Sequence, residues 1–260
     1  MKICITGTSG FVGNYLSVNM PKNYIVEKIN LRGQDLANLN NKIIKKIFSS
    51  DVVINSAASL HPKTSNDFFL NEEFLNYLLN LNKIYNKRII HLSTINCLIK
   101  DRIDRYTLSK KISEKKSKNF KNLTIIRLPL VIMRKKNILQ PKGPIVKFFH
   151  YLNYIKLPIY PMIYPGHLYQ PIDIKLINKT IINVIRKNKS NKIINLTGKK
   201  KLCLWDIFKE IADMKKKRVC KVDLRFFYRF MPVKIKLLIK RQNNFLQQFA
   251  SIDHSKLKPR

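Results

Sequence analysis

A tyrosine and a lysine four residues apart, Tyr106 and Lys110, are the residues of this chain best suited to move a proton. Four residues is about one helical turn, so both side chains would lie on one helix face. A tyrosine has an unperturbed pKa of ~10, and a nearby ammonium group favours the phenolate and lowers that pKa. Such a pair suits proton transfer to or from a carbonyl or alcohol oxygen. Ser93 and Thr94 end a strand-like run at residues 87–94, where a hydroxyl can face the same site.

Three glycines near the start of the chain form a second group. Gly7, Gly10 and Gly13 recur every third residue between an apolar run at residues 2–6 and a helical pattern. Glycines let the backbone approach a phosphate closely, and the N–H groups and dipole of a helix start attract the anion. The spacing differs from the G-x-G-x-x-G fingerprint, so the dinucleotide interpretation depends on the strand before and the helix after. A merely structural tight turn is the alternative.

The elements that position these residues alternate along the chain. Strands are predicted over 2–6, 24–29, 51–58, 87–94, 122–132 and 192–198, and helices over 38–48, 67–85, 104–118 and 204–214, with a first helix that stops before Pro21. Residues 170–187 are predicted to be a strand end that runs into a helix. This alternation predicts an α/β fold, a Rossmann-like doubly wound parallel sheet with helices on both faces. Right-handed crossovers then bring the strand ends, and with them the site, to one edge of the sheet.

The charge of the chain is strongly positive. Fifty-one Lys and Arg against 15 Asp and Glu give a formal net charge of +36. Such an excess favours anionic partners, namely nucleotides, nucleic acid or anionic lipid. However, the lysines are spread over the whole chain and no recognised nucleic-acid module accompanies them. Compositional drift towards Lys, Asn and Ile therefore outweighs a specific nucleic-acid function.

Neither a membrane span nor a metal site is indicated. No apolar run approaches the ~18–20 residues of a span, and the N-terminus lacks a signal-peptide layout, so a cytoplasmic protein is expected. The four cysteines show no C-x-x-C spacing, and the five histidines are scattered. We therefore expect no bound metal.

Taken together, the motifs resemble the extended short-chain dehydrogenase/reductase family, which contains nucleotide-sugar epimerases, dehydratases and 4-ketoreductases. The matching stretches are TGTSGFVG (6–13), DVVINSAA (51–58), HLST (91–94), YTLSK (106–110), IIRLP (125–129), and more weakly QPIDI (170–174), NLTG (195–198) and SIDHSKLKP (251–259). The resemblance covers nearly the whole chain. It implies an NAD(P)-dependent epimerase/dehydratase or reductase that passes a hydride between nicotinamide and a sugar carbon of a nucleotide-activated sugar. The outcome is either reduction of a keto-sugar, or oxidation followed by reduction on the other face, which is epimerisation.

The resemblance also implies roles for single residues. Tyr106 would be the general acid/base, Lys110 would hold the nicotinamide ribose and tune Tyr106, and Thr94 would polarise the substrate carbonyl, with Ser93 as the second candidate. The implied cofactor-binding residues are Gly7, Thr8, Ser9, Gly10, Phe11, Val12 and Gly13 at the pyrophosphate, Ala57 and Ala58 on the adenosine side, and Asn71, Ser93, Lys110 and Pro129.

The type of dinucleotide depends on the end of the second strand. An acidic residue there would bind the ribose 2′-OH of NAD. Here the region carries Asn30 and Arg32. Because an arginine can meet a 2′-phosphate, NADP is favoured over NAD. The alternative is that Arg32 is an ordinary solvated residue. By resemblance to the reductase members, Asp35 and Leu36 would contact the adenine.

The resemblance further suggests the division of the chain. Residues 1–135 would form the NAD(P)-binding Rossmann domain, to which residues 170–196 return. Residues 136–169 and 197–260 would form a smaller, shortened substrate-binding lobe at the C-terminal side. A homodimer is common in the family.

Two features of the chain favour an alternative. The segments between Thr94 and Tyr106 and between Ala58 and Asn71 are short, and CLIK replaces the Tyr-Gly that usually follows the hydroxyl residue. The alternative is a non-catalytic dinucleotide-binding protein whose basic surface, including the basic stretch 234–241, binds RNA or an anionic membrane face.

Overall fold

The structure is a computed structural model that describes residues 1–100, 102–136, 138–140, 142–143, 159–164, 168–188, 191–214, 216, 218–223 and 232–233. The chain divides into two compact units. The first comprises residues 1–128 and 174–196, and the second comprises residues 129–173 and 197–260. The stretches 234–241 and 251–259 lie outside the described residues.

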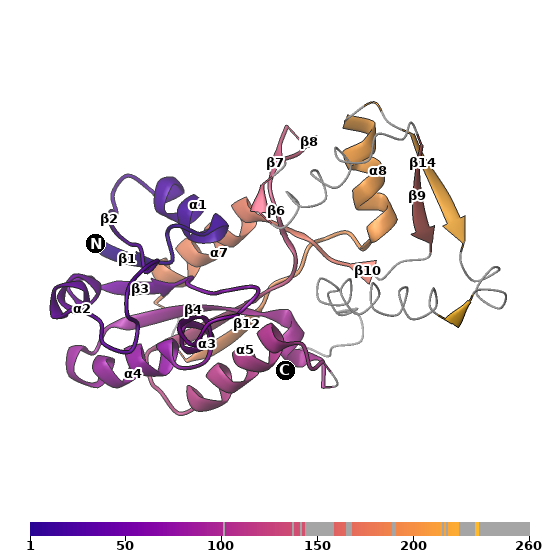
Figure 1. Cartoon of the computed structure of the whole chain (residues 1–260). Coiled ribbons are helices and arrows are strands. Elements are labelled where there is room, and N and C mark those ends of the chain that lie inside the picture. The colour runs from indigo at the N-terminus through magenta and orange to yellow at the C-terminus, as the bar shows by residue number, and fades with distance from the viewer. Residues whose placement is uncertain are drawn as a thin grey trace. The chain divides into compact units, whose positions relative to one another are not determined.

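A six-stranded sheet forms the centre of the first unit (Figure 1). The strand order is β12-β5-β4-β3-β1-β2, and every neighbouring pair is parallel. The strands are β1 (Lys2–Thr6), β2 (Ile25–Ile29), β3 (Val52–Asn55), β4 (Arg88–Thr94), β5 (Leu123–Leu128) and β12 (Lys192–Asn195). The order reverses beside β1, which is where open α/β sheets bind their ligands. The predicted α/β fold with a Rossmann-like parallel sheet is confirmed.

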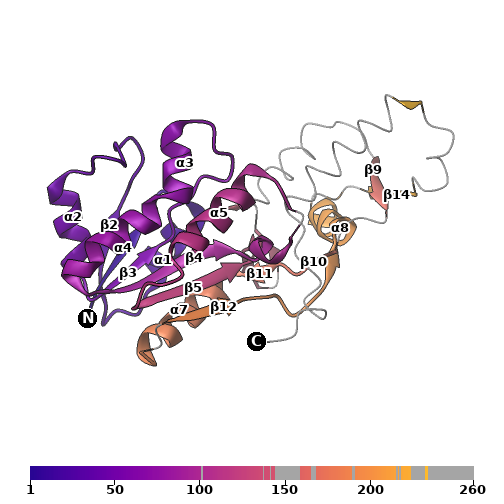
Figure 2. The ribbon, with the colours of Figure 1, turned by 90° about the horizontal axis from the view of Figure 1, so that it is seen from below.

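Helices cover both faces of this sheet (Figures 1 and 2). They are α1 (Phe11–Asn19), α2 (Asn41–Phe48), α3 (Ser65–Glu72), α4 (Phe74–Tyr85), α5 (Arg105–Lys116) and α7 (Ile174–Arg186), with a short 3₁₀ helix η1 (Ile95–Leu98). Helices α1 and α7 pack together on one face, and α4 and α5 lie on the other. Alternate apolar residues of each strand face the α2 and α4 side, where Cys4, Val53 and Ile89 share one core with Phe48 and Phe74.

Two predicted elements are divided in the structure. The single helix predicted over 67–85 is two helices that meet at Glu73, whose φ of −106° departs from helical geometry. A capping box between Thr64 and Asp67 fixes the start of the first helix. The strand predicted over 122–132 ends at Leu128. The buried Pro129 that follows has no backbone N–H to donate to a neighbouring strand of the sheet.

In the described part of the second unit, short strand pairs accompany one helix. Strands β6 (Val131–Ile132) and β11 (Ile172–Asp173) pair in parallel, as do β9 (Ile159–Tyr164) and β14 (Arg218–Asp223). Strands β7 (Arg134–Lys135) and β8 (Ile138–Leu139), and β10 (Leu168–Tyr169) and β13 (Leu202–Cys203), pair in antiparallel fashion. Helix α8 (Leu204–Met214) is joined to β7 by an ion pair between Glu210 and Arg134. Across the described part of the chain, no helix has the length and apolarity needed to cross a membrane.

Candidate active site

The site lies where the strands at the centre of the first unit end. The parallel register places Thr6 opposite Asn55, and Asn55 opposite His91. Their side chains form a buried polar chain across the three strands. The hydroxyl of Thr6 donates to Asn55 Oδ1 (2.9 Å), and the amide of Asn55 lies 3.2 Å from His91 Nδ1. The glycine turn after β1 and Thr94 at the end of β4 therefore share one edge of the sheet.

The glycine turn packs tightly against the segment after β3. Gly7 has a φ of +72°, which favours glycine, and a Cβ there would lie 2.6 Å from the Cα of Ala57. A Cβ on Gly13 would lie 2.3 Å from the carbonyl oxygen of Gly7 and 2.5 Å from Ser56 Oγ. Gly7 thus allows the turn to pack against the backbone of Ala57, and Gly13 allows the start of α1 to pack against the Gly7 carbonyl.

Gly10 has a different surrounding. It stands at the start of α1, which has no side-chain cap, and a Cβ there would meet only the Gly7 carbonyl oxygen, at 3.3 Å. Ser9 and Gly10 are exposed, whereas Thr8, Phe11 and Val12 are half-buried. An uncapped helix start beside open space fits a phosphate group.

The residues after β2 form an ordered, exposed turn. Asn30 Oδ1 accepts from the backbone N–H of Arg32 (3.0 Å). The Arg32 side chain is exposed and forms no ion pair within the described residues. The carboxylate of Asp35 accepts from Ala37 N (3.1 Å) and Asn38 Nδ2 (3.0 Å), and these bonds lower its pKa. Leu36 is buried.

Asn71 is buried on α3 and holds the loop that follows β3. Its side-chain oxygen accepts from Ser59 N (2.9 Å), and its amide nitrogen donates to the Ser59 carbonyl (2.8 Å). Ala57 is buried and Ala58 is exposed. The polar groups of Asn71 thus fix the loop that carries Ala57 and Ala58.

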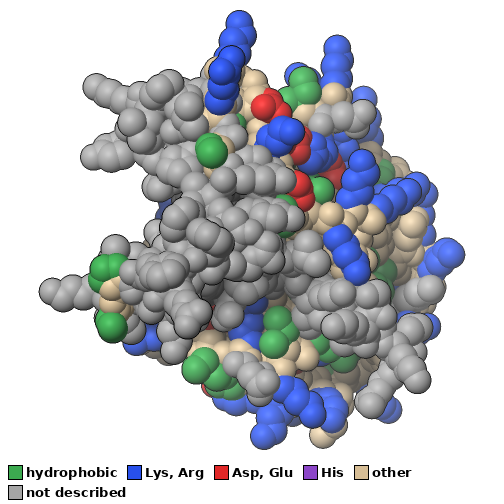
Figure 3. All heavy atoms as spheres, turned by 90° about the vertical axis from the view of Figure 1, so that its right-hand side faces the viewer, with side chains coloured by type: hydrophobic (Ala, Val, Ile, Leu, Met, Phe, Trp, Pro, Cys, Tyr) green, Lys and Arg blue, Asp and Glu red, His purple; other side chains and the backbone are tan. Residues whose placement is uncertain are grey.

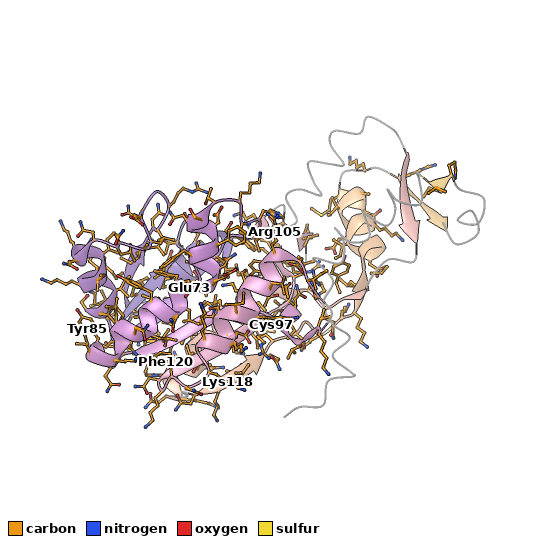
Figure 4. The ribbon with its side chains drawn as sticks, turned by 60° about the horizontal axis from the view of Figure 1, so that its bottom comes forward. Glu73, Tyr85, Cys97, Arg105, Lys118 and Phe120 are labelled. Carbon is orange, nitrogen blue, oxygen red and sulfur yellow. The ribbon has the colours of Figure 1, made fainter. Side chains whose placement is uncertain are left out.

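Helix α5 carries the predicted acid/base pair and begins at Arg105, which is labelled in Figure 4. Asp104 caps its start by accepting from Thr107 N (2.9 Å). Tyr106 is half-buried, and Lys110 is fully buried. The Lys110 ammonium is among the buried groups that have no hydrogen-bond partner within the described residues. Because a buried unpaired charge is strongly unfavourable, this position needs a partner group.

The electrostatics of the pair differ from the prediction. Burial raises the pKa of Tyr106, and the nearby Asp104 carboxylate raises it further, so the net shift is opposite to the lowering expected from Lys110. Loss of hydration opposes the phenolate more than any nearby charge supports it. Burial also lowers the pKa of Lys110 to about 8, against the opposing effects of Cys97 and Glu114.

The two hydroxyl candidates have different partners. Thr94 Oγ1 accepts from Asn96 N (3.3 Å), which leaves its proton available for donation. The hydroxyl of Ser93 donates to Glu114 Oε1 (2.6 Å) and lies 3.8 Å from Cys97 Sγ. Ser93 is therefore held by α5, whereas Thr94 can serve a substrate oxygen.

The sequence did not point to three charged residues around the site, which are Lys111, Glu114 and Arg127. Glu114 contacts both Ser93 and Arg127. Lys111 donates to the carbonyl oxygens of residues 99, 100 and 102, at 2.6, 3.1 and 3.2 Å, and so fixes the short segment before Tyr106. The signal for Glu114 was its spacing, since Tyr106, Lys110 and Glu114 recur every four residues on one helix face.

Basic side chains are spread over the described surface on the face drawn in Figure 3, with few acidic ones between them. Within the described residues, no group of three or more His, Cys, Asp or Glu could hold a metal ion.

No family model and no curated protein matches the chain, but many solved structures do. A dTDP-4-dehydrorhamnose reductase from Bacillus anthracis, in complex with NADP, is 14% identical with a TM-score of 0.67 over 87% of this chain and 85% of that chain. A UDP-glucuronic acid 4-epimerase from Bacillus cereus, in complex with NAD, is 20% identical with a TM-score of 0.66 over 86% of each chain. A short-chain dehydrogenase/reductase superfamily protein from Agrobacterium tumefaciens, with bound NAD, is 15% identical with a TM-score of 0.69 over 86% of this chain and 85% of that chain.

At these identities the likeness establishes the fold. The chain has the fold of short-chain dehydrogenase/reductase proteins, as the sequence motifs predicted. Its function has to be argued from the site.

Proposed function

We propose that the chain is an NAD(P)-dependent enzyme of the extended short-chain dehydrogenase/reductase type that reduces a keto group on a nucleotide-activated sugar. The observation that carries this proposal is the Lys110 ammonium, which lies fully buried on the same helix as Tyr106 and has no hydrogen-bond partner in the described part of the chain. The hydroxyls of a cofactor ribose would supply the missing acceptors.

The remaining cofactor residues agree with this arrangement. The open space at Gly10 and the uncapped start of α1 suit a pyrophosphate. The adenosine end would lie along Ala57 and the turn after β2. When bound, the nicotinamide supplies or accepts the hydride.

In the reductive direction Tyr106 acts as the proton donor. A tyrosine phenol is protonated near neutrality at its ordinary pKa of ~10, and burial raises the pKa of Tyr106 further, so the proton is present before reduction. In a reduction it gives this proton to the oxygen that was the carbonyl, while the Thr94 hydroxyl donates a hydrogen bond to the same oxygen. Oxidation followed by reduction on the other face, which is epimerisation, would first require Tyr106 as a base.

NADP is the proposed cofactor. Arg32 is exposed at the end of β2 without an ion pair in the described structure, and Asn30 stands beside it where an acidic residue would repel a 2′-phosphate. The guanidinium of Arg32 can bind the 2′-phosphate of NADP with two hydrogen bonds. The strongly basic surface would attract the diphosphate of the substrate.

The test uses purified protein with NADPH or NADH and a set of keto-sugar nucleotides. We expect NADPH oxidation, and we expect Tyr106→Phe to lower kcat by about 100-fold or more while NADPH binding is retained. Full activity of Tyr106→Phe would show that the assigned roles are wrong.

Two further outcomes are informative. Binding to RNA or anionic vesicles that weakens steeply with salt, together with no turnover, would favour the non-catalytic alternative. Light scattering of the purified protein tests the homodimer that is also part of this proposal.

A further inference from the structure

A cluster of buried polar groups joins helix α5 to the neighbouring strands, on the helix face that also carries Tyr106 and Lys110. Glu114 accepts from Arg127 Nε at 3.0 and 3.1 Å through its two carboxylate oxygens, and also from Arg127 Nη2. The side chains of Arg127 and Glu114 are only 14% and 9% exposed. Ser93 donates to the same carboxylate at 2.6 Å.

The cluster joins the elements that carry the candidate catalytic groups. Glu114 belongs to α5, which holds Tyr106, and lies two turns after it. Ser93 directly precedes Thr94 at the end of β4. Arg127 belongs to β5, and its Nη1 also reaches Asn195 Oδ1 of β12 at 3.5 Å. One carboxylate therefore links the helix of the proton donor to the strand of the hydroxyl donor.

A second ion pair on the same helix provides a contrast. Lys116 of α5 pairs with Glu73, at the junction of α3 and α4, but these side chains are 42% and 37% exposed. Exposed pairs of this kind contribute little to stability, whereas a buried carboxylate that accepts several hydrogen bonds has one well-defined geometry. Of these two ion pairs, the buried one is therefore the pair suited to hold α5 in a fixed place against β4.

We propose that Glu114, with Arg127 and Ser93, is a positioning device that sets the separation between the Tyr106 phenol and the Thr94 hydroxyl for proton transfer to the substrate oxygen. This inference rests on the proposed function for its catalytic readout. Neither Glu114 nor Arg127 touches the substrate oxygen in this mechanism. Both act through the elements they join, where a displacement of about 1 Å can lower a rate by about 100-fold.

The first test separates positioning from stability. Glu114→Leu and Arg127→Leu each leave one charge buried without a partner, so both single variants should lower the melting temperature. The double variant removes both charges and should recover most of it. We expect the double variant to keep a kcat about 100-fold below wild type with an unchanged NADPH dissociation constant. Recovery of both melting temperature and kcat would show that the cluster is only structural.

Ser93 provides a milder variant that leaves the ion pair intact. Ser93→Ala removes the link between β4 and Glu114, and we expect kcat to fall by about 10-fold with NADPH affinity unchanged. Ser93→Thr keeps a hydroxyl and should restore kcat. If Ser93→Ala keeps a kcat within two-fold of wild type, the proposed link has no role. The matched control, Glu73→Gln with Lys116→Gln, removes the exposed pair and should leave kcat unchanged.

A readout without turnover distinguishes this proposal from the proposed function. Crystal structures of the wild type and of the Glu114→Leu, Arg127→Leu double variant give the distance between Tyr106 Oη and Thr94 Oγ1. We expect this distance to change by about 1 Å or more. An unchanged distance would overturn the positioning role, whether or not the wild type reduces any of the sugars tested.

Discussion

Replacement of Gly13 by alanine should destabilise the first unit. The new Cβ would lie 2.3 Å from the Gly7 carbonyl oxygen and 2.5 Å from Ser56 Oγ. Ser56 can rotate, but the Gly7 carbonyl is backbone, so the start of α1 must shift away from the turn. Overpacking of this kind costs about 1–3 kcal/mol, and we place this contact at the upper end. Alanine regains about 1 kcal/mol inside a helix, which leaves a net loss of about 2 kcal/mol.

A loss of this size should lower the melting temperature by about 4–8 °C for a chain of this length. The assay is thermal unfolding followed by circular dichroism. A melting temperature within about 1 °C of wild type would refute the close approach of Gly13 to Gly7, since a contact of about 2 kcal/mol has to produce a larger shift.

Gly10→Ala is the matched control on the same turn. Its Cβ meets only the Gly7 carbonyl oxygen, at 3.3 Å, and otherwise enters open space. Stability should therefore change by less than about 1 kcal/mol. The methyl group would nevertheless stand where the pyrophosphate is proposed to bind, so the dissociation constant of NADPH should rise by about 10-fold or more, or about 1.4 kcal/mol. Unchanged NADPH binding by this variant would refute the phosphate site at the start of α1.

Two further outcomes follow from single side chains. Arg32→Ala should weaken NADP binding by about 10-fold or more, since a hydrogen bond to a charged group contributes about 1.5–3 kcal/mol. NAD binding should be unchanged. An equal loss of affinity for both cofactors in a fluorescence titration would contradict the role of Arg32. Burial, and then the Lys110 charge, lower the pKa of His91 far below its ordinary value, so below pH ~6.5 the unfolded chain binds a proton that the folded chain does not. The free energy of unfolding should therefore fall as the pH drops below ~6.5. His91→Gln should reduce the slope of this free energy against pH, measured by urea unfolding between pH 5 and 7.5. An identical slope in the variant would show that His91 is not the group involved.

The fold was predictable because its signals are local in the sequence. Apolar runs such as residues 51–55 alternate with helical patterns, and this alternation alone implies a parallel sheet. The glycine turn was predictable for a similar reason, since its strand, glycines and helix are contiguous. The break at Glu73 was not, because the apolar pattern continues across it and only the backbone geometry separates α3 from α4.

The electrostatics of the site were less accessible from the sequence. The spacing of Tyr106 and Lys110 predicts a shared helix face, but the direction of a pKa shift depends on burial, which spacing does not report. In the same way, nothing around Ser93 in the sequence reveals that its hydroxyl binds Glu114, 21 residues further along the chain. Contacts between distant residues decide which of two adjacent hydroxyls is available.

The return of residues 174–196 to the first unit has a consequence for synthesis of the protein. Strand β12 completes the sheet by pairing with β5, and Asn195 follows Arg127 by 68 residues. At a synthesis rate of about 5–20 residues per second, the edge of β5 waits roughly 3–14 s for its partner. Arg88 of β4 waits longer still for the carbonyl groups of Val184 and Ile185 at the end of α7, which follow it by 96 and 97 residues. During this interval the nascent chain presents an unpaired strand edge, the feature by which folding intermediates associate with each other or are captured by chaperones.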